Sequence, residues 1–254
     1  MAVRKKLDLG VIIRSSNERT EKLCADSAKL HTLVKNVVIV RKSPFPEAMK
    51  ECVRVAKSRG WKRYLMMDAD VVLVSNWRDI VEDSLKKLND VYEIDFDTQD
   101  RFVKPPIQRG VYLVNAMFDD ERMECLKQTE KMTKPEGSIR HIMLEKFNIK
   151  HIYVKETIGY HGYMQSRADV FNRFALRACR NHDYINRFGL FVGADRFSKE
   201  VRVAKLGWSK GVSDMKNYTQ YMDARKKTKA YDIGYDELPA LKINLQTFYK
   251  EIGK

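Results

Sequence analysis

Two aspartates stand close together inside an otherwise apolar stretch of this chain. Asp68 and Asp70 are separated only by Ala69, and the stretch runs from residue 64 to residue 74. Such an apolar, β-branched run is typical of a buried strand, where ionised carboxylates are costly unless a cation meets them. Side chains two positions apart on an extended segment point to the same side, so both carboxylates can bind one ion. Hard oxygen ligands of this kind predict Mg²⁺ or Mn²⁺.

The elements that must position this pair follow from hydrophobic periodicity. Strands are expected at 7–13, 36–40, 61–67, 107–114 and 151–154, and helices at 20–33, 47–58, 76–88, 119–133, 171–179 and 218–226. This alternating order predicts an α/β fold, a mainly parallel sheet with helices on both faces. Ligands of such sheets bind beyond the carboxyl ends of the strands, where the aspartates lie.

Composition narrows the class of protein. Of 254 residues, 44% are hydrophobic and 32% charged, which excludes a disordered or fibrous chain. The four cysteines, at 24, 52, 125 and 179, are widely separated and resemble the reduced core residues of a cytosolic protein. The first residues lack the apolar stretch of a signal peptide, and no window is apolar enough to span a membrane. We therefore expect a cytoplasmic protein, or one of the host cytoplasm if it is viral.

The positive charge is unevenly distributed along the chain. The net charge is +14, and residues 171–254 hold 17 Lys and Arg against 9 Asp and Glu, a net charge of +8. We expect residues 1–170 to form a catalytic core and residues 171–254 a basic C-terminal extension. Such an extension would attract a polyanion or an anionic membrane surface, although a charge excess of one sign is also common on a solvated face.

Three segments together resemble the glycosyltransferases of the GT-A fold. Tyr64–Leu73 resembles their DxD strand, Arg109–Asn115 their glycine-containing acceptor-side strand, and Gly159–Tyr163 the loop whose histidine often completes the metal site. The likeness spans roughly residues 7–165. It implies a Rossmann-like sheet and a Mn²⁺- or Mg²⁺-dependent transfer of a hexose or pentose from a nucleotide-sugar, a UDP-sugar first of all. Val40–Ser43 lacks the acidic residue with which many relatives contact the nucleoside.

The resemblance assigns roles to individual residues. Asp70 would ligate the metal, and Asp68 would bind the ribose or reach the metal through water. Taken alone, the two aspartates could also be a helix cap or a salt-bridge pair at the end of a strand. His161 would be the third ligand, because imidazole is acceptable to Mn²⁺. Taken alone, His161 would be an ordinary loop histidine.

Basic and polar residues around the sheet are the candidates for binding the sugar donor, and an acidic residue is the candidate catalytic base. Arg14, Ser15, Lys42 and Arg109 are expected to contact the nucleotide-sugar, since guanidinium groups match phosphates well; for Lys42, simple surface exposure fits equally. Glu136, at an expected helix start, is the candidate base for an inverting transfer. It could equally complement the helix dipole, and a retaining enzyme would need no such base.

The acceptor is predicted from charge. Residues 217–231 interleave aromatic and cationic side chains, the combination that binds nucleic-acid backbones and stacks on bases. A hydroxymethylated base in DNA, as modified in some viruses and flipped from the stack, would suit such an enzyme. The alternatives are a lipid-linked or cell-surface glycan at an anionic membrane, a metal-dependent nucleotidyl or phosphoryl transferase, or a non-catalytic nucleic-acid-binding protein. The aromatic residues could also be the buried face of a helix.

Overall fold

The computed structural model describes residues 6–102, 106–129, 135–164, 167–180, 199–214 and 243–252. The chain packs into two units. The first comprises residues 1–98, 108–161 and 241–254, and the second comprises residues 99–107 and 162–240. The functional division expected at residue 170 stays a prediction.

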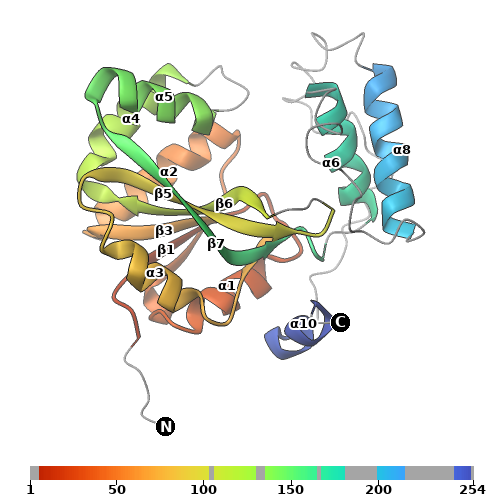
Figure 1. Ribbon diagram of the computed structural model, residues 1–254, viewed down its shortest axis with the longest axis horizontal. Helices are drawn as coiled ribbons and strands as arrows, with labels where there is room; N and C mark the ends of the chain where they lie inside the picture. Colours follow the sequence, from red (N-terminus) through yellow and green to blue (C-terminus); the bar gives the residue numbers. More distant parts are fainter. Residues whose placement is uncertain are drawn as a thin grey trace. The chain divides into compact units, whose positions relative to one another are not determined.

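Helices and strands follow one another along the chain, and those within residues 162–240 belong to the second unit (Figure 1). Up to residue 85 they are β1 (Gly10–Arg14), α1 (Glu21–Lys29), β2 (Val37–Val40), α2 (Phe45–Ser58), β3 (Arg63–Asp68), β4 (Val71–Leu73) and α3 (Trp77–Leu85). Then follow β5 (Val91–Asp100), β6 (Ile107–Asn115), α4 (Asp119–Gln128), α5 (Pro135–Phe147), β7 (Lys150–His161), α6 (Arg167–Arg180), α8 (Lys199–Asp214) and α10 (Leu245–Ile252). Short 3₁₀ turns, Val34–Asn36 and Ala116–Phe118, precede β2 and α4.

The strands form one sheet in the order β2-β1-β3-β6-β5-β7-β4. β1 pairs in parallel with both β2 and β3, whereas β6 joins β3 and β7 joins β4 in antiparallel pairs. The register places Arg14, the last residue of β1, opposite Asp68, the last residue of β3. The parallel pairing therefore brings these two side chains to the same edge of the sheet.

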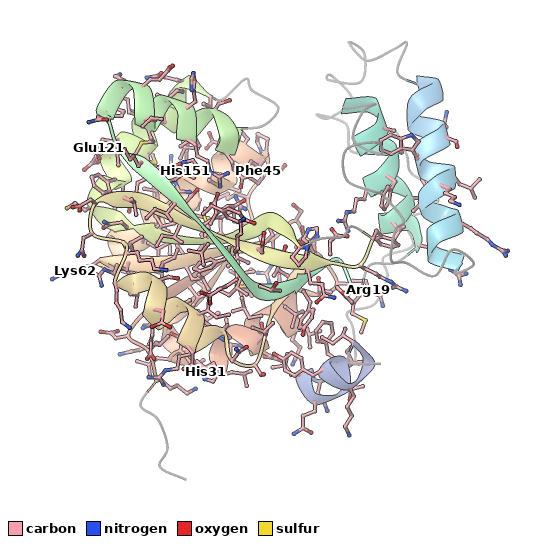
Figure 2. All side chains as sticks on the ribbon, viewed as in Figure 1. Arg19, His31, Phe45, Lys62, Glu121 and His151 are labelled. Atoms are coloured by element: carbon pink, nitrogen blue, oxygen red, sulfur yellow. The ribbon has the colours of Figure 1, made fainter. Side chains whose placement is uncertain are left out.

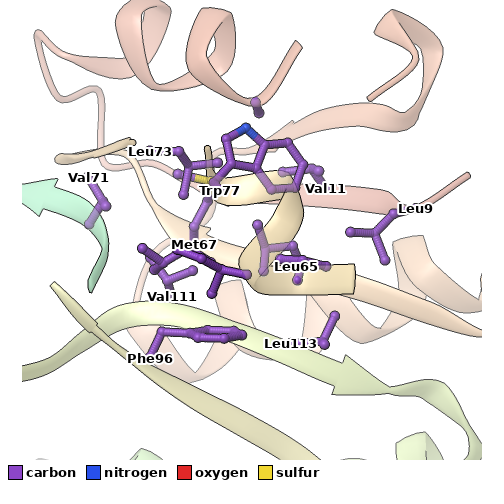
Figure 3. Packing of buried hydrophobic residues seen from close by; sticks show 14 of the residues in the cluster. Leu9, Val11, Leu65, Met67, Val71, Leu73, Trp77, Phe96, Val111 and Leu113 are labelled. Carbon is purple, nitrogen blue, oxygen red and sulfur yellow. The ribbon is translucent and has the colours of Figure 1, made fainter. Parts of the chain in front are cut away.

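Alternating side chains divide the core into two layers. Val11, Leu65, Met67 and Leu113 face the layer under α1 and α3, together with the fully buried Trp77 (Figure 3). Their neighbours along the strands, such as Met66, lie in the opposite layer with α2, α4 and α5. Figure 1 shows these helices on opposite faces of the sheet. The α/β class expected from the sequence, with helices on both faces, is confirmed.

Strand β5 is not predicted from the sequence, because its acidic residues interrupt the apolar pattern expected of a buried strand. Glu93 and Asp95 are buried in the sheet and are met by arginines from the helices above. Arg122 of α4 contacts Glu93 at 3.0 Å, and Arg140 of α5 contacts Glu93 at 3.0 Å and Asp95 at 2.6 Å. We call Glu93, Asp95, Arg122 and Arg140 the β5 network. Its carboxylates are neutralised by residues that are distant in sequence.

Other expectations have mixed outcomes. The buried, free state expected for the cysteines is confirmed for Cys24, Cys52 and Cys125. The helix expected at 171–179 is part of α6. The helix expected at 218–226 and the basic and aromatic segment 217–231 lie outside the described residues. No helix in the described ranges combines the length and apolarity needed to cross a bilayer.

Candidate functional site

Arg14 and Asp68 form the centre of the site at the carboxyl ends of β1 and β3. Nη2 of Arg14 lies 2.6 Å from Oδ1 of Asp68. The Arg14 side chain is only 4% exposed, whereas that of Asp68 is 34% exposed. A guanidinium that is nearly removed from water requires an anion beside it. The cation that meets Asp68 in this structure is therefore a residue of the chain itself.

Helix α5 adds a second carboxylate to the same guanidinium. Nη1 of Arg14 donates to Oε1 of Glu136 at 2.9 Å, across 122 residues of sequence. Glu136 stands in the first turn of α5 and is 31% exposed. One ion pair thus joins Arg14, the expected contact to the sugar donor, to Glu136, the expected catalytic base.

Asp70 meets His161 near Asp68. Nε2 of His161 lies 3.2 Å from Oδ2 of Asp70. The pairing of β4 with β7 explains this contact, because Val71 is in register with His161 and Asp70 directly precedes Val71. The two residues proposed as metal ligands therefore come from adjacent strands and face one another.

Glu18 is a further carboxylate of the site that the sequence-based expectation omits. It follows β1, and its Oε2 accepts from the Ser15 hydroxyl at 2.9 Å and from the Ser16 amide at 2.6 Å. Burial and the nearby charge of Asp70 raise its pKa. Its position beyond the carboxyl end of a parallel strand is the signal that could have identified it. We call Glu18, Asp68, Asp70 and Glu136, with Arg14 and His161, the carboxylate cluster.

Burial and neighbouring charges shift the pKa values of the cluster. Partial burial, opposed by Arg14 and reinforced by Glu136 and Asp70, raises the pKa of Asp68 to about 7; His161 acts in the lowering direction. Burial is the largest influence on the Arg14 pKa and lowers it, but Asp68 and Glu136 hold the net pKa well above its usual range. Two carboxylates, Asp68 and Glu136, thus share the guanidinium of Arg14. A second cation at this place would lower the electrostatic cost.

Gly110 lets the backbone of β6 approach Asp68. Its φ is +63°, and a Cβ built there would lie 2.7 Å from Oδ2 of Asp68. Both the left-handed conformation and the close approach favour glycine. The glycine-containing strand singled out in the sequence therefore borders the acidic pair.

Aromatic rings hold the arginines in place. The guanidinium of Arg14 lies 4.7 Å from the ring centroid of Phe45 and 5.5 Å from that of Tyr112. Arg140 of the β5 network lies 5.5 Å from the same Tyr112 ring. Tyr112 thus connects the carboxylate cluster to the β5 network.

The remaining predicted donor contacts are less defined. The Ser15 side chain is buried and donates to Glu18, and Lys42 is exposed beyond β2. Arg109 belongs to β6, but its side chain lies outside the described residues. Their contact with a nucleotide stays a prediction.

The residues of the cluster suit a divalent ion by their chemistry. No three His, Cys, Asp or Glu side chains in the described part of the chain already stand in a metal-binding arrangement. A Mg²⁺-type site nevertheless needs only one or two protein carboxylates, with water and substrate phosphates as the other ligands. Asp70 and His161, which lie together beside Asp68, fit such a site.

An open cavity of about 960 Å³ lies at the other end of β3. Trp61, Lys62, Arg63 and Asn115 are among its lining residues, and none belongs to the carboxylate cluster. Figure 2 shows Lys62, before β3, and Arg19, after β1, at opposite ends of the sheet. The cavity is therefore separate from the edge at which a parallel sheet binds ligands.

No protein-family model and no curated protein matches this sequence. One similar solved structure is a glycosyltransferase involved in the glycosylation of the major capsid of PBCV-1, 12% identical over 63% of this chain and 95% of that chain, with a TM-score of 0.43. Another is a cytidylyltransferase from Leptospira borgpetersenii, 13% identical over 83% and 98%, with a TM-score of 0.40. The glycosyltransferase GlyE of Streptococcus pneumoniae is 12% identical over 88% and 64%, with a TM-score of 0.37. Likenesses of this size do not define a function, which must be inferred from the side chains.

Proposed function

We propose that the protein is a metal-dependent glycosyltransferase that moves a sugar from a nucleotide-sugar to a hydroxyl acceptor. The observation that carries the proposal is the carboxylate cluster at the carboxyl ends of β1 and β3, where Arg14 contacts Asp68 and Glu136 and where Asp70 and His161 lie together nearby. The Asp68 carboxylate is 34% exposed and its pKa is raised to about 7, so a further cation would stabilise its ionised form. Carboxylates in this setting suit a site that receives a divalent ion with its substrate.

The residues of the cluster divide the work. Asp70 and His161 would hold Mn²⁺ or Mg²⁺, and Asp68 would bind the ribose or reach the ion through water. When bound, the ion would neutralise the charge that develops on the departing nucleoside diphosphate. Arg14 keeps Asp68 and Glu136 oriented through its two ion pairs. It also supplies positive charge at the edge where the phosphates would lie.

Glu136 is the proposed general base if the transfer inverts the anomeric centre. Its carboxylate would take the proton of the acceptor hydroxyl as that oxygen bonds to the anomeric carbon and the diphosphate leaves. The ion pair with Arg14 orients the Glu136 carboxylate for this step. A retaining enzyme would instead use Glu136 only to position Arg14.

The acceptor is proposed to be a polyanion, with a hydroxymethylated base in DNA as the first candidate. The support is the net charge of +8 in residues 171–254. A lipid-linked or cell-surface glycan at an anionic membrane is the alternative acceptor. A cytoplasmic location, in a host cell if the protein is viral, accompanies the DNA candidate.

A screen of UDP- and GDP-sugars with Mn²⁺ tests the proposal. Each donor is incubated with unmodified DNA, hydroxymethylated DNA or lipid-linked acceptors, and both sugar transfer and nucleotide products are measured. Release of a nucleoside diphosphate with transfer of the sugar is expected. In a parallel reaction with nucleoside triphosphates in place of the nucleotide-sugars, release of pyrophosphate would show a nucleotidyltransferase, the alternative enzyme that would use the same carboxylates. Binding of DNA without turnover of any donor would leave a nucleic-acid-binding protein and overturn the proposal.

A further inference from the structure

Helix α10 joins the first unit beside the strands that carry Asp70 and His161. Its apolar residues Leu245, Phe248, Tyr249 and Ile252 recur with helical spacing. The side chain of Asn244 accepts from the Thr247 amide at 2.9 Å, a typical helix cap. Phe248 is fully buried although the helix has only eight residues. The helix is therefore held against the first unit by packing of its side chains as well as by its covalent connection.

Two contacts from α10 reach the pair of strands β4 and β7. The Tyr249 hydroxyl donates to the Leu73 carbonyl of β4 at 2.6 Å. The Phe248 ring meets the Tyr160 ring of β7 edge to face, with 6.1 Å between centroids. Leu73 is paired with Gly159, and Val71 with His161. One turn of α10 thus contacts both members of this strand pair.

The contacts from α10 add to others that hold β4, since the Leu73 amide donates to the Ser27 hydroxyl of α1 at 3.1 Å and the Val74 amide to the Ile158 carbonyl at 3.0 Å. β4 has only three residues and lies at the edge of the sheet. A Cβ at Gly159 would lie 2.7 Å from Cγ1 of Val71, so the two strands are closely packed where they meet. A shift of β4 along β7 would separate Asp70 from His161, because Asp70 directly precedes Val71, the register partner of His161. Contacts that hold β4 against β7 therefore also fix the positions of Asp70 and His161.

We propose that α10 is a positioning element that holds Asp70 against His161 and thereby sets the affinity for the divalent ion. The inference rests on the proposed function for the identity of that ion. The positioning itself rests on the contacts of Tyr249 and Phe248. Tyr249 and Phe248 are positioning residues, since both act through β4 and β7.

The test compares Tyr249→Phe with a matched control. Tyr249→Phe removes only the hydroxyl that binds Leu73. Tyr153→Phe also removes one hydroxyl from a hydrogen bond, the one to Asp97, but on the far part of β7. Amide hydrogen exchange of 71–73 and 159–161 is measured in the metal-free proteins. Mn²⁺ affinity is measured by calorimetry, and thermal unfolding reports overall stability.

Tyr249→Phe is expected to speed exchange of these amides and to weaken Mn²⁺ binding, each roughly fivefold, as for one lost hydrogen bond. Tyr153→Phe should leave both near wild type at a similar melting temperature. Unchanged exchange in Tyr249→Phe, or faster exchange with wild-type Mn²⁺ affinity, would overturn the inference. A wild-type protein without affinity for Mn²⁺ would overturn the metal assignment instead, and the exchange rates would then decide the positioning role alone.

Discussion

The carboxylate cluster and the β5 network use the same residue types in opposite ways. In the β5 network, Glu93 and Asp95 face Arg122 and Arg140, so two carboxylates meet two guanidinium groups. In the carboxylate cluster, Arg14 alone serves Asp68 and Glu136, with Asp70 and Glu18 close by. Asp95 is fully buried, whereas Asp68 is 34% exposed. The two groups share Tyr112, yet only one is open to solvent.

The comparison separates a structural from a functional arrangement of charges. A closed network resists the removal of a cation, because the buried charge of its partner is then left unpaired. An open group, in which Asp68 and Glu136 share one guanidinium, can instead receive a further cation. Mutations should accordingly affect stability in the first group and binding or turnover in the second.

The largest expected effect is on the open cluster. Asp70→Asn should remove divalent-ion dependence and lower turnover by about a thousandfold or more, roughly 4 kcal/mol of transition-state stabilisation, with the fold intact. Mn²⁺ calorimetry and initial rates measure the change. Asp83→Asn, at an exposed carboxylate that pairs with Lys86, is the control and should behave as wild type. Wild-type Mn²⁺ affinity in Asp70→Asn would refute the metal assignment.

The closed network should respond in stability. Arg122→Met removes a nearly buried cation from Glu93 and should lower the free energy of unfolding by about 3–5 kcal/mol. This free energy is measured by urea unfolding, with tryptophan fluorescence as the signal. Arg54→Met, which breaks an exposed pair with Glu51, should change stability by less than about 1 kcal/mol. Equal effects of the two substitutions would mean that burial does not distinguish them.

A substitution at Gly110, which packs against Asp68, is expected to have a smaller effect. Gly110→Ala should cost about 1–2 kcal/mol for the left-handed backbone and, in addition, displace the Asp68 carboxylate. Gly60→Ala is a matched control, because Gly60 has the same φ of +63° and a Cβ added there would meet no atom within 4 Å. Turnover should therefore fall further in Gly110→Ala than in Gly60→Ala at comparable stability. Identical turnover in the two variants would argue against a role for the Asp68 contact.

The smallest effect concerns pH. Burial and the charge of Glu93 raise the pKa of Asp95 to about 8, against about 4 in an unfolded chain. Between these values the folded state binds more protons, so the contribution of Asp95 to stability is present at low pH and is lost as pH rises toward 8.

Asp95→Asn resembles the protonated form and should flatten this dependence, with near wild-type stability at pH 5 and higher stability than wild type at pH 9. Denaturant unfolding at both pH values is the measurement. A parallel pH dependence in wild type and Asp95→Asn would assign the slope to other groups.

Much of the fold follows from local pattern. The strand around Leu65 and the helix around Cys52 are each signalled by their own periodicity, and β5 is missed because Glu93 and Asp95 point inward. Local periodicity misplaces residues that have long-range partners. It shows which face of a strand or helix a residue lies on, but not which residue of another element it contacts.

By itself, the sequence determines the α/β order, the apolar strand that ends at Asp68, and the proximity of Asp68 to Asp70. Only the tertiary structure decides which groups meet these carboxylates. Parallel pairing brings Arg14 to Asp68, α5 brings Glu136 to Arg14, and the pairing of β4 with β7 brings His161 to Asp70. The physical reason is that each of these contacts depends on strand register and helix packing between segments far apart in the chain. Those are properties of the assembled sheet, and no local run of residues contains them.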